Sequence, residues 1–271
     1  MGKVAKISLI IGFIIIAALV LYTSFRTTKD AIGNAPTLAV IPDAASGYPR
    51  PYCALIFDDL GTSIEEIKSL YDLDIPLTIS VFPEERFSKN VAYIGQRCGF
   101  SVLIHLPLEP KTEIESYRKV KKDFIGTHHG RQGNERLLRK YLNSIRIAMG
   151  VNNHMGSKAT ENPKIMRLVL SHMKRDNLVF VDSLTSLDSI ACEVAAQVGV
   201  RCRRNDGFLD AVDDTEVIKE KIVKLIALAR EKGKIIVIAH PRANTLTVLE
   251  ELMPALKEQL QFVTLKDYLE L

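Results

Sequence analysis

The sequence of 271 residues contains no tryptophan, and aromatic residues make up only 7% of it. Few aromatic rings are therefore available to stack against sugars along an extended groove. No C-x-x-C pair occurs, so the four cysteines do not predict a cysteine zinc site. No G-x-G-x-x-G or Walker sequence follows any apolar run, which argues against nucleotide binding. Neither Ser157 nor Ser183 sits in a G-x-S-x-G elbow, which argues against a serine hydrolase.

Neither sign of charge is in large excess. The formal net charge is +4, and Lys and Arg are interspersed with Asp and Glu, so a nucleic-acid partner is not predicted. The composition, with 47% hydrophobic and 25% charged residues, is that of a globular protein. The length suffices for one large α/β domain and an appendage.

One long hydrophobic run does occur, at the N-terminus. Lys3 and Lys6 precede an uncharged stretch from Ile7 to Tyr22, which is just long enough to cross a bilayer. The two lysines favour a cytoplasmic N-terminus. A cleaved signal peptide is the alternative, but no small-x-small cleavage site follows the run. We therefore predict a transmembrane anchor over residues 1–26.

The rest of the chain is then expected outside the cytoplasm. Residues 27–50 lack periodicity and carry Gly, Pro, Ser and Asn, which is typical of a flexible linker. Residues 51–271 form the predicted periplasmic or extracytoplasmic domain. Disulfides are permitted in such a domain, and the spacing of Cys192 and Cys202 would allow a local bridge. Two small buried apolar side chains are an equally good interpretation.

From residue 51 onward, short β-rich apolar runs alternate with longer helical patterns, which predicts parallel strands with helical crossovers. The predicted strands are 53–57, 77–82, 101–104, 149–151, 178–181, 200–202 and 234–239, with a late one at 262–264. The predicted helices are 63–70, 134–148, 163–175, 188–198, 215–232 and 245–259. Seven or eight βα units favour a barrel over an open doubly wound sheet.

Polar side chains directly follow five of the predicted strands. Because the carboxyl ends of parallel strands share one face, these side chains should meet at one rim. They are Asp58 and Asp59, His105 with Glu109 four residues on, Asn152 with Asn153 and His154, Asp182, and His240. Any single Asp could merely cap the next helix, and any single His could bond a backbone carbonyl. Together, carboxylates and imidazoles suit Zn²⁺ or another first-row divalent ion that activates water.

The segments Ile-Phe-Asp58-Asp59, Gly99-x5-His105 and Ile-Ala-His240-Pro, with Asp182, resemble the NodB-homology polysaccharide deacetylases of carbohydrate esterase family 4. The resemblance is closest to the divergent branch of that family. The segments that carry it are Asn-Asn-His154-Met-Gly-Ser, Val-Asp182-Ser-x-Thr, Gly-Phe-Leu-Asp210 and Ala-His240-Pro. It implies a distorted (β/α) barrel of about seven parallel strands, a divalent metal for which the ligand types favour zinc, and deacetylation of N- or O-acetylated sugars.

The resemblance also implies a ligand set for the metal. The second Asp of the family's Phe-Asp-Asp motif binds metal, which corresponds to Asp59, and the first His of its H-x-x-x-H motif corresponds to His105. Glu109 stands where the family has the second His. We predict His154 as the third ligand, with Glu109 as the alternative.

The catalytic roles follow in the same way. The resemblance implies that Asp58 is the base and His240 the general acid, and we expect Asp182 to orient His240 and raise its pKa. Asn153 and Asp210 are predicted to bind substrate or to be alternative ligands.

The predicted function is a membrane-anchored, metal-dependent hydrolase that removes acetyl groups from an envelope polysaccharide or peptidoglycan fragment. The alternative is a catalytically silent envelope protein that keeps the barrel and binds a glycan or a protein partner. The loss of the second family histidine favours the alternative, and the retention of the other motif residues favours chemistry.

Overall fold

The computed structural model describes residues 49–112 and 123–271, all of which belong to one compact unit, Ala44–Leu271. The predicted anchor at 1–26 and nearly all of the predicted linker at 27–50 lie outside the described residues. Within the described ranges, none of the helices combines the length and hydropathy that a membrane crossing requires.

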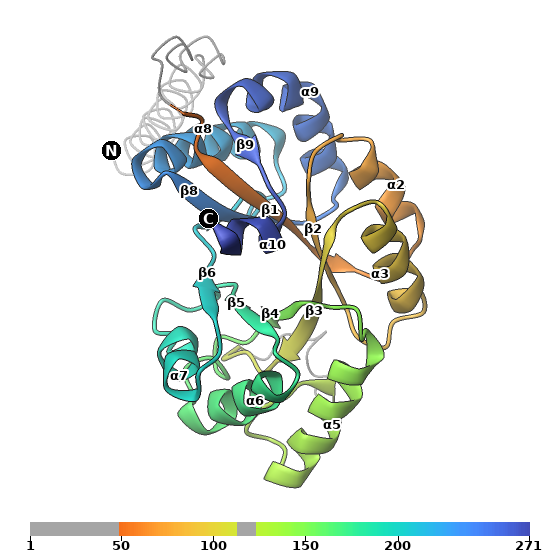
Figure 1. Ribbon diagram of the computed structural model, residues 1–271, viewed down its shortest axis with the longest axis vertical. Coiled ribbons are helices and arrows are strands. Elements are labelled where there is room, and N and C mark those ends of the chain that lie inside the picture. Colours follow the sequence, from red (N-terminus) through yellow and green to blue (C-terminus); the bar gives the residue numbers. More distant parts are fainter. Residues whose placement is uncertain (1–48, 113–122) are drawn as a thin grey trace, which may run out of the picture. The chain divides into compact units, whose positions relative to one another are not determined.

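In the described part of the chain, nine strands form one sheet with parallel pairing throughout (Figure 1). Their order is β6-β5-β4-β3-β2-β1-β8-β7, and β9 pairs with β1. The strands are β1 Tyr52–Leu60, β2 Thr78–Val81, β3 Ser101–Leu108, β4 Gly150–Met155, β5 Val179–Asp182, β6 Cys202–Arg204, β7 Gly207–Phe208, β8 Lys234–Ala239 and β9 Gln261–Phe262.

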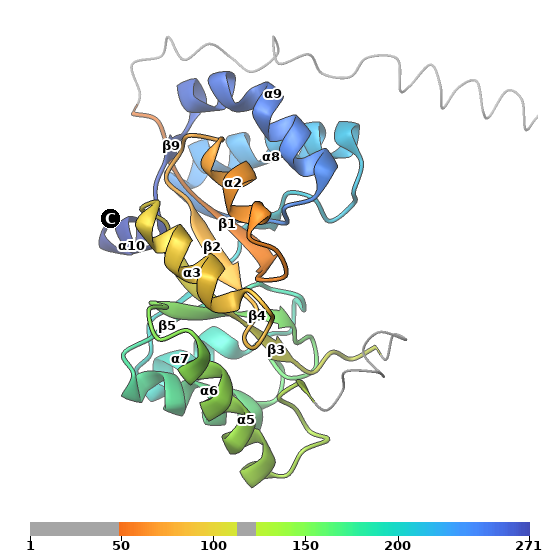
Figure 2. The ribbon, with the colours of Figure 1, turned by 90° about the vertical axis from the view of Figure 1, so that its right-hand side faces the viewer.

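Helices flank the strands that they connect (Figures 1 and 2). They are α2 Glu65–Tyr71, α3 Ser88–Arg97, α5 Arg131–Ser144, α6 Pro163–Arg175, α7 Ala191–Val198, α8 Thr215–Lys232, α9 Ala243–Gln259 and α10 Leu265–Glu270. The sheet curls into a half-barrel, which agrees with the predicted distorted barrel of parallel strands. The strand that was not predicted is β7, which has only two residues, whereas the two-residue β9 corresponds to the late strand predicted at 262–264.

The distortion lies where the two ends of the sheet approach each other. β6 and β7 stand at opposite ends of the strand order, although only two residues separate them in the chain. The backbone N–H of Asn205 donates to the carbonyl of Asp182 in β5, and that of Asp206 donates to the carbonyl of Ile236 in β8. A short irregular segment, rather than a strand pair, therefore links the two ends.

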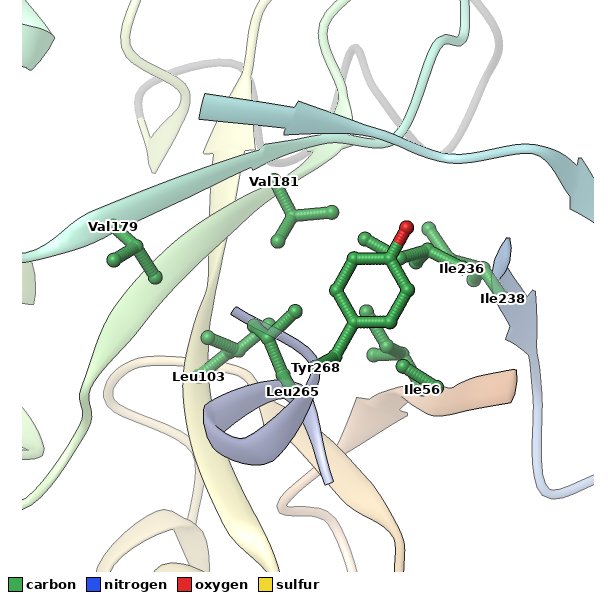
Figure 3. Packing of buried hydrophobic residues seen from close by; sticks show 9 residues of the cluster. Ile56, Leu103, Val179, Val181, Ile236, Ile238, Leu265 and Tyr268 are labelled. Carbon is green, nitrogen blue, oxygen red and sulfur yellow. The ribbon is translucent and has the colours of Figure 1, made fainter. Parts of the chain in front are cut away.

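The concave face of the sheet is filled by an apolar cluster that α10 completes (Figure 3). Its buried members are Ala54, Ile56, Leu103, Val179, Val181, Ile236, Ile238, Leu265 and Tyr268. The N–H groups of Leu265 and Lys266 donate to the side chains of Thr78 and Ser101, which begin β2 and β3. α10 thus closes the end of the half-barrel at which the strands start, and the opposite end remains for polar side chains.

Helix α3 was not predicted from the sequence, and a glycine explains why. Gly95 lies within this helix, where glycine is unfavourable by about 1 kcal/mol relative to alanine. A Cβ at this position would lie 2.3 Å from Cδ1 of Ile79 in β2. Gly95 therefore allows α3 to pack closely on β2, and the same glycine weakens the helical pattern in the sequence.

The structure also answers the question about the cysteines. Cys192 and Cys202 form a disulfide that joins the start of α7 to the start of β6. Cys53 and Cys98 are free thiols, and Cys53 is buried.

Candidate active site

Three predicted ligands meet at the carboxyl ends of β1, β3 and β4. Asp59 Oδ1 lies 3.0 Å from His105 Nε2 and 3.2 Å from His154 Nδ1, and the two ring nitrogens are 3.1 Å apart. Within residues 49–112 and 123–271, this is the one group of three or more His, Cys, Asp or Glu side chains whose ligand atoms converge, all within 4.8 Å of one another. We refer to Asp59, His105 and His154 as the ligand triangle.

The donor set of the ligand triangle fits a divalent metal. Ligand atoms of a tetrahedral zinc site are spaced by about 3.3–3.6 Å, so the three atoms need to separate by only a few tenths of an ångström. Asp59 Oδ1 is buried and, among the described residues, has no aligned hydrogen-bond donor despite its two close imidazoles. An oxygen left in this state is what a cation would satisfy.

Asp59 reaches the triangle through an irregularity in β1. Side chains alternate along a strand, and Ile56 belongs to the concave face, so Asp58 should face inward and Asp59 outward. The pairing of β1 with β2 shifts register between Phe57 and Leu60, and Asp59 has φ of 66°. This left-handed conformation costs a non-glycine residue about 1 kcal/mol or more and turns the Asp59 side chain toward the rim.

A buried network behind His105 fixes the orientation of its ring. His105 Nδ1 lies 2.9 Å from Asn152 Oδ1 and 3.7 Å from Asp58 Oδ2. The amide of Asn152 donates to Asp58 Oδ1 at 2.7 Å, and its Oδ1 also accepts from the Ser80 hydroxyl. Because Asn152 Oδ1 accepts, Nδ1 of His105 carries the proton and Nε2 presents its lone pair to the triangle.

Sequence reasoning placed both Asn152 and Asn153 at the rim but assigned a role only to Asn153. On β4, Asn152 and His154 share one face, and Asn153 points to the other. Asn153 Oδ1 accepts from the N–H of Ser183, and its amide donates to the carbonyl of Met155. The structure does not bring Asn153, which was predicted to bind substrate or metal, to the ligand triangle, and its amide group instead holds β4 to the segment after β5.

Electrostatics separate the ionisable groups of the site. Burial raises the pKa of Asp58. Burial alone would lower the pKa of His105, but Asp58 and Asp59 outweigh it and raise that pKa to about 9. Burial would likewise raise the pKa of Asp59, but His105 and His154 hold it well below its usual range. Burial lowers the pKa of His154. Without a cation, these shifts favour an ionised Asp59 beside a protonated His105, and a bound metal would displace the proton from His105 Nε2 and leave the neutral ring with its proton on Nδ1.

His240 approaches Asp59 from another side of the triangle, with Nε2 at 3.8 Å from Asp59 Oδ2. Its Nδ1 lies 2.8 Å from Oδ1 of the fully buried Asp210, and its backbone N–H donates to Asp210 Oδ2. The Thr245 hydroxyl also donates to Asp210 Oδ2. Burial tends to lower the pKa of His240, but Asp210 raises it above its ordinary value.

Asp182 does not orient His240, and that prediction is wrong. Val179 and Val181 face the apolar cluster, so Asp182 points to the convex side of β5. There its carboxylate accepts from the Ser189 hydroxyl at 2.7 Å and from the N–H of Leu184 at 3.0 Å. Asp210, which we expected to bind substrate or metal, holds His240 instead.

Glu109 does not join the ligand triangle either. Its Oε1 lies 2.8 Å from Lys158 Nζ, and its Oε2 accepts from the Thr127 hydroxyl at 2.7 Å. Burial would raise the pKa of Glu109, but Lys158 and Thr127 outweigh it and lower that pKa. The carboxylate is therefore occupied within the protein.

Comparison with known proteins identifies relatives and the family of the chain. The chain is 29% identical over 238 residues to an uncharacterized protein of Haemophilus influenzae, covering 87% of this chain and 82% of that protein. It is 29% identical over 229 residues to the uncharacterized protein YibQ of Escherichia coli, covering 84% and 69% of the two chains. The family model of the divergent polysaccharide deacetylases matches residues 55–269.

Solved structures share the fold. A crystal structure of an uncharacterized protein from Agrobacterium tumefaciens has a TM-score of 0.73 at 19% identity, covering 82% of this chain and 91% of that one. A putative cellobiose-phosphate cleavage protein from Enterococcus faecalis has a TM-score of 0.58 at 12% identity, covering 81% and 99%. From the family match over most of its described length, this chain belongs to the divergent polysaccharide deacetylase family.

Proposed function

We propose that this protein is an extracytoplasmic, metal-dependent hydrolase that removes acetyl groups from a cell-envelope polysaccharide or peptidoglycan fragment. The observation that carries the proposal is the ligand triangle, with the Asp210–His240 pair beside it. The family and the fold support carbohydrate deacetylation as the reaction class.

Asp59, His105 and His154 would hold the metal, and zinc suits one carboxylate and two imidazoles. A divalent ion in this place supplies a Lewis acid for the acetyl carbonyl and lowers the pKa of water. The lone pair of His105 Nε2 is directed to the triangle because Asn152 holds the opposite ring nitrogen. The Asp59 carboxylate supplies the negative charge that the site needs.

Two further residues would move protons. Asp58 is the proposed base, since burial raises its pKa and a carboxyl accepts a proton more readily when its pKa lies nearer to the working pH. His240 is the proposed acid. Asp210 accepts from Nδ1–H and raises the pKa of the ring, so the protonated ring also carries a proton on Nε2, which can pass to the leaving amine or alkoxide.

Two observations support an extracytoplasmic location. The uncharged run from Ile7 to Tyr22 has the length of a membrane anchor. The Cys192–Cys202 disulfide suits an oxidising compartment such as the periplasm. A reporter fused to the C-terminus tests this: alkaline phosphatase activity supports the orientation, and activity of a cytoplasm-only reporter contradicts it.

Acetate release tests the reaction. Acetylated chito-oligosaccharides and acetylated peptidoglycan fragments are offered to the wild type and to Asp58→Asn and His240→Ala at equal metal loading. Each variant should lose a factor of about 10² to 10⁴ in rate. Asp182→Asn is the matched control, because it neutralises a buried carboxylate on the convex side of the sheet, and it should keep the wild-type rate.

Two outcomes count against the proposal. If Asp58→Asn and His240→Ala retain the rate of an active wild type, the assigned roles are wrong. If the metal-loaded wild type releases no acetate from any acetylated glycan, the silent binding protein becomes the better account.

A further inference from the structure

A large cleft lies between α5 and α6 on the outside of the half-barrel, away from the apolar cluster. The two helices follow β3 and β4 and lie side by side (Figures 1 and 2). The cleft has a volume of about 770 Å³. Five of its lining side chains are permanently cationic and one is a carboxylate, Glu135. The cationic ones are Arg131, Arg139, Lys164, Arg167 and Arg175.

Most of this positive charge is not neutralised within the protein. Glu135 pairs with Arg131 at 2.9 Å, and Arg167 donates to the neutral amide of Gln197. In the described ranges, Lys164, Arg139 and Arg175 form no salt bridge. The protein as a whole carries a formal charge of only +4, so the cleft concentrates positive charge well beyond the average of the surface.

The spacing of the cations favours a linear ligand. Lys164 and Arg175 lie eleven residues apart on α6, which corresponds to about 16 Å along the helix. A single small anion could contact only one end of this row. Four of the five cations are arginines, whose planar guanidinium groups match carboxylate and phosphate oxygens. A flat membrane surface would contact the outer edges of α5 and α6 but would not fill a concave cleft.

One end of the cleft lies at the loops that follow β3 and β4, two of the strands that carry the candidate active site. Thr127 lines the cleft and donates to Glu109, which directly follows β3, the strand of His105. Asn162 lines it as well and caps α6 after the loop that leaves β4, the strand of His154. Phe124, three residues before Thr127, has its ring 6.0 Å from that of His154.

We propose that this cleft binds an anionic polysaccharide whose charges are carboxylates, as an extension of the glycan chain that enters the active site. The inference rests on the proposed function for the glycan nature of the ligand, and it narrows the substrate class to acidic glycans. The arginines supply the affinity, because the described residues that line the cleft include no Trp, Tyr or Phe on which a sugar could stack.

Binding to the full-length protein, freed of metal by a chelator, tests the cleft separately from catalysis. The probes are a fluorescently labelled, partly O-acetylated oligo-uronate and a neutral oligomannoside of equal length and acetylation. The oligo-uronate should bind at least tenfold more tightly, and added salt should weaken it. The triple variant Arg139→Gln, Arg167→Gln and Arg175→Gln should lose about tenfold in affinity, because three exposed charge contacts each contribute modestly.

The matched control removes the same charge elsewhere. Arg97, Arg136 and Arg146 are exposed and do not line the cleft, so their change to Gln should leave binding unchanged. Equal binding of the two glycans, or an equal loss in the control, overturns the inference. Capture of the protein by phosphatidylglycerol vesicles through the same three arginines, with no binding of the oligo-uronate, also overturns it.

Catalysis gives an independent readout. If no acetylated glycan is hydrolysed but the oligo-uronate binds through the cleft, the proposed function fails and the binding site stands. If acetate is released from neutral and acidic glycans at equal rates by wild type and triple variant, the function stands and the acidic-glycan inference fails.

Discussion

Zinc should stabilise the fold through His154 and not through Glu109. The prediction follows from the geometry, since His154 Nδ1 lies 3.1 and 3.2 Å from the other two atoms of the ligand triangle. Glu109 is instead held by Lys158 and Thr127. The perturbation is a pair of single changes, His154→Ala and Glu109→Gln, each studied in the purified full-length protein with and without zinc.

The size of the effect can be worked out from binding linkage. A ligand present at 100 times its Kd stabilises the folded state by about 2.7 kcal/mol. For a domain of this size, that corresponds to a rise in Tm of about 5–10 °C. Removing one of three ligands should weaken binding by at least about 100-fold, the upper end of what supporting residues alone contribute. At the same zinc concentration, the remaining stabilisation is then about 0.4 kcal/mol or less, a rise of under about 2 °C.

The assay is differential scanning fluorimetry with metal analysis of the purified protein. Glu109→Gln should melt lower than the wild type without metal, because Lys158 loses its partner, yet its zinc-induced rise should be undiminished. The comparison uses the zinc-induced rise in Tm of each variant and not its absolute Tm, so the packing lost in His154→Ala does not affect the conclusion. A full rise in His154→Ala with none in Glu109→Gln would refute the assignment and make Glu109 the third ligand. If zinc, cobalt and manganese all fail to raise the Tm of the wild type, the triangle is not a metal site.

Three further predictions concern the surroundings of the site. Burial tends to lower the pKa of His240 and Asp210 raises it, so Asp210→Asn should lower it and move the alkaline limb of the kcat/KM profile to lower pH. Asn152→Leu removes the oxygen that accepts from Nδ1 of His105 and orients its ring toward the triangle. Chelator competition should then show a zinc affinity weaker by about 10- to 100-fold. Replacing Cys192 and Cys202 together by Ser should lower the free energy of unfolding by about 2–3 kcal/mol in urea, as expected for a loop of ten residues.

Some elements could be predicted from the sequence to the residue, because local signals mark both of their ends. The Asn162 side chain accepts from the N–H groups of Lys164 and Ile165 and thus begins α6. Asp214 begins α8 in the same way, and Gly233, in the left-handed conformation, ends it. Strand β8 consists of Lys234 and an uninterrupted apolar run of five residues, and it is bounded by that glycine and by a histidine.

The strands that carry the site were predicted too short. We expected one strand to end at Val151, but β4 continues through Asn152, Asn153 and His154. Polar residues usually indicate that a strand has ended, yet here two of them are buried within the protein, where Asn152 bonds Asp58 in β1 and Asn153 bonds the segment after β5. A hydrophobicity pattern cannot detect such a strand, because its inward face changes from apolar to polar at the rim.

The alternation of side chains along each strand could have shown which of the predicted site residues point toward the inside of the half-barrel. Ile56, Leu103 and Ile238 face the core, and two residues after each comes a site residue, Asp58, His105 or His240. The same count from Val181 reaches Ser183 and excludes Asp182. Asp59 is the exception, because its place at the rim depends on a register shift and a left-handed backbone that no pattern of residues predicts.

In this chain, Glu109 replaces the second histidine of the family's H-x-x-x-H motif, and this replacement argues against activity less strongly than the sequence suggests. A catalytic zinc site needs three protein ligands and an open position, and the identity of the strand that supplies each ligand is secondary. Glu109 lies just after the end of β3 and pairs with Lys158. The replacement of the histidine therefore adds no unpaired charge near the site. His154, on the adjacent strand β4, brings an imidazole nitrogen to within 3.2 Å of Asp59 Oδ1. A change of ligand between neighbouring parallel strands would therefore preserve the number and type of ligands that the family resemblance implies, which is why we propose a hydrolase and not a silent binding protein.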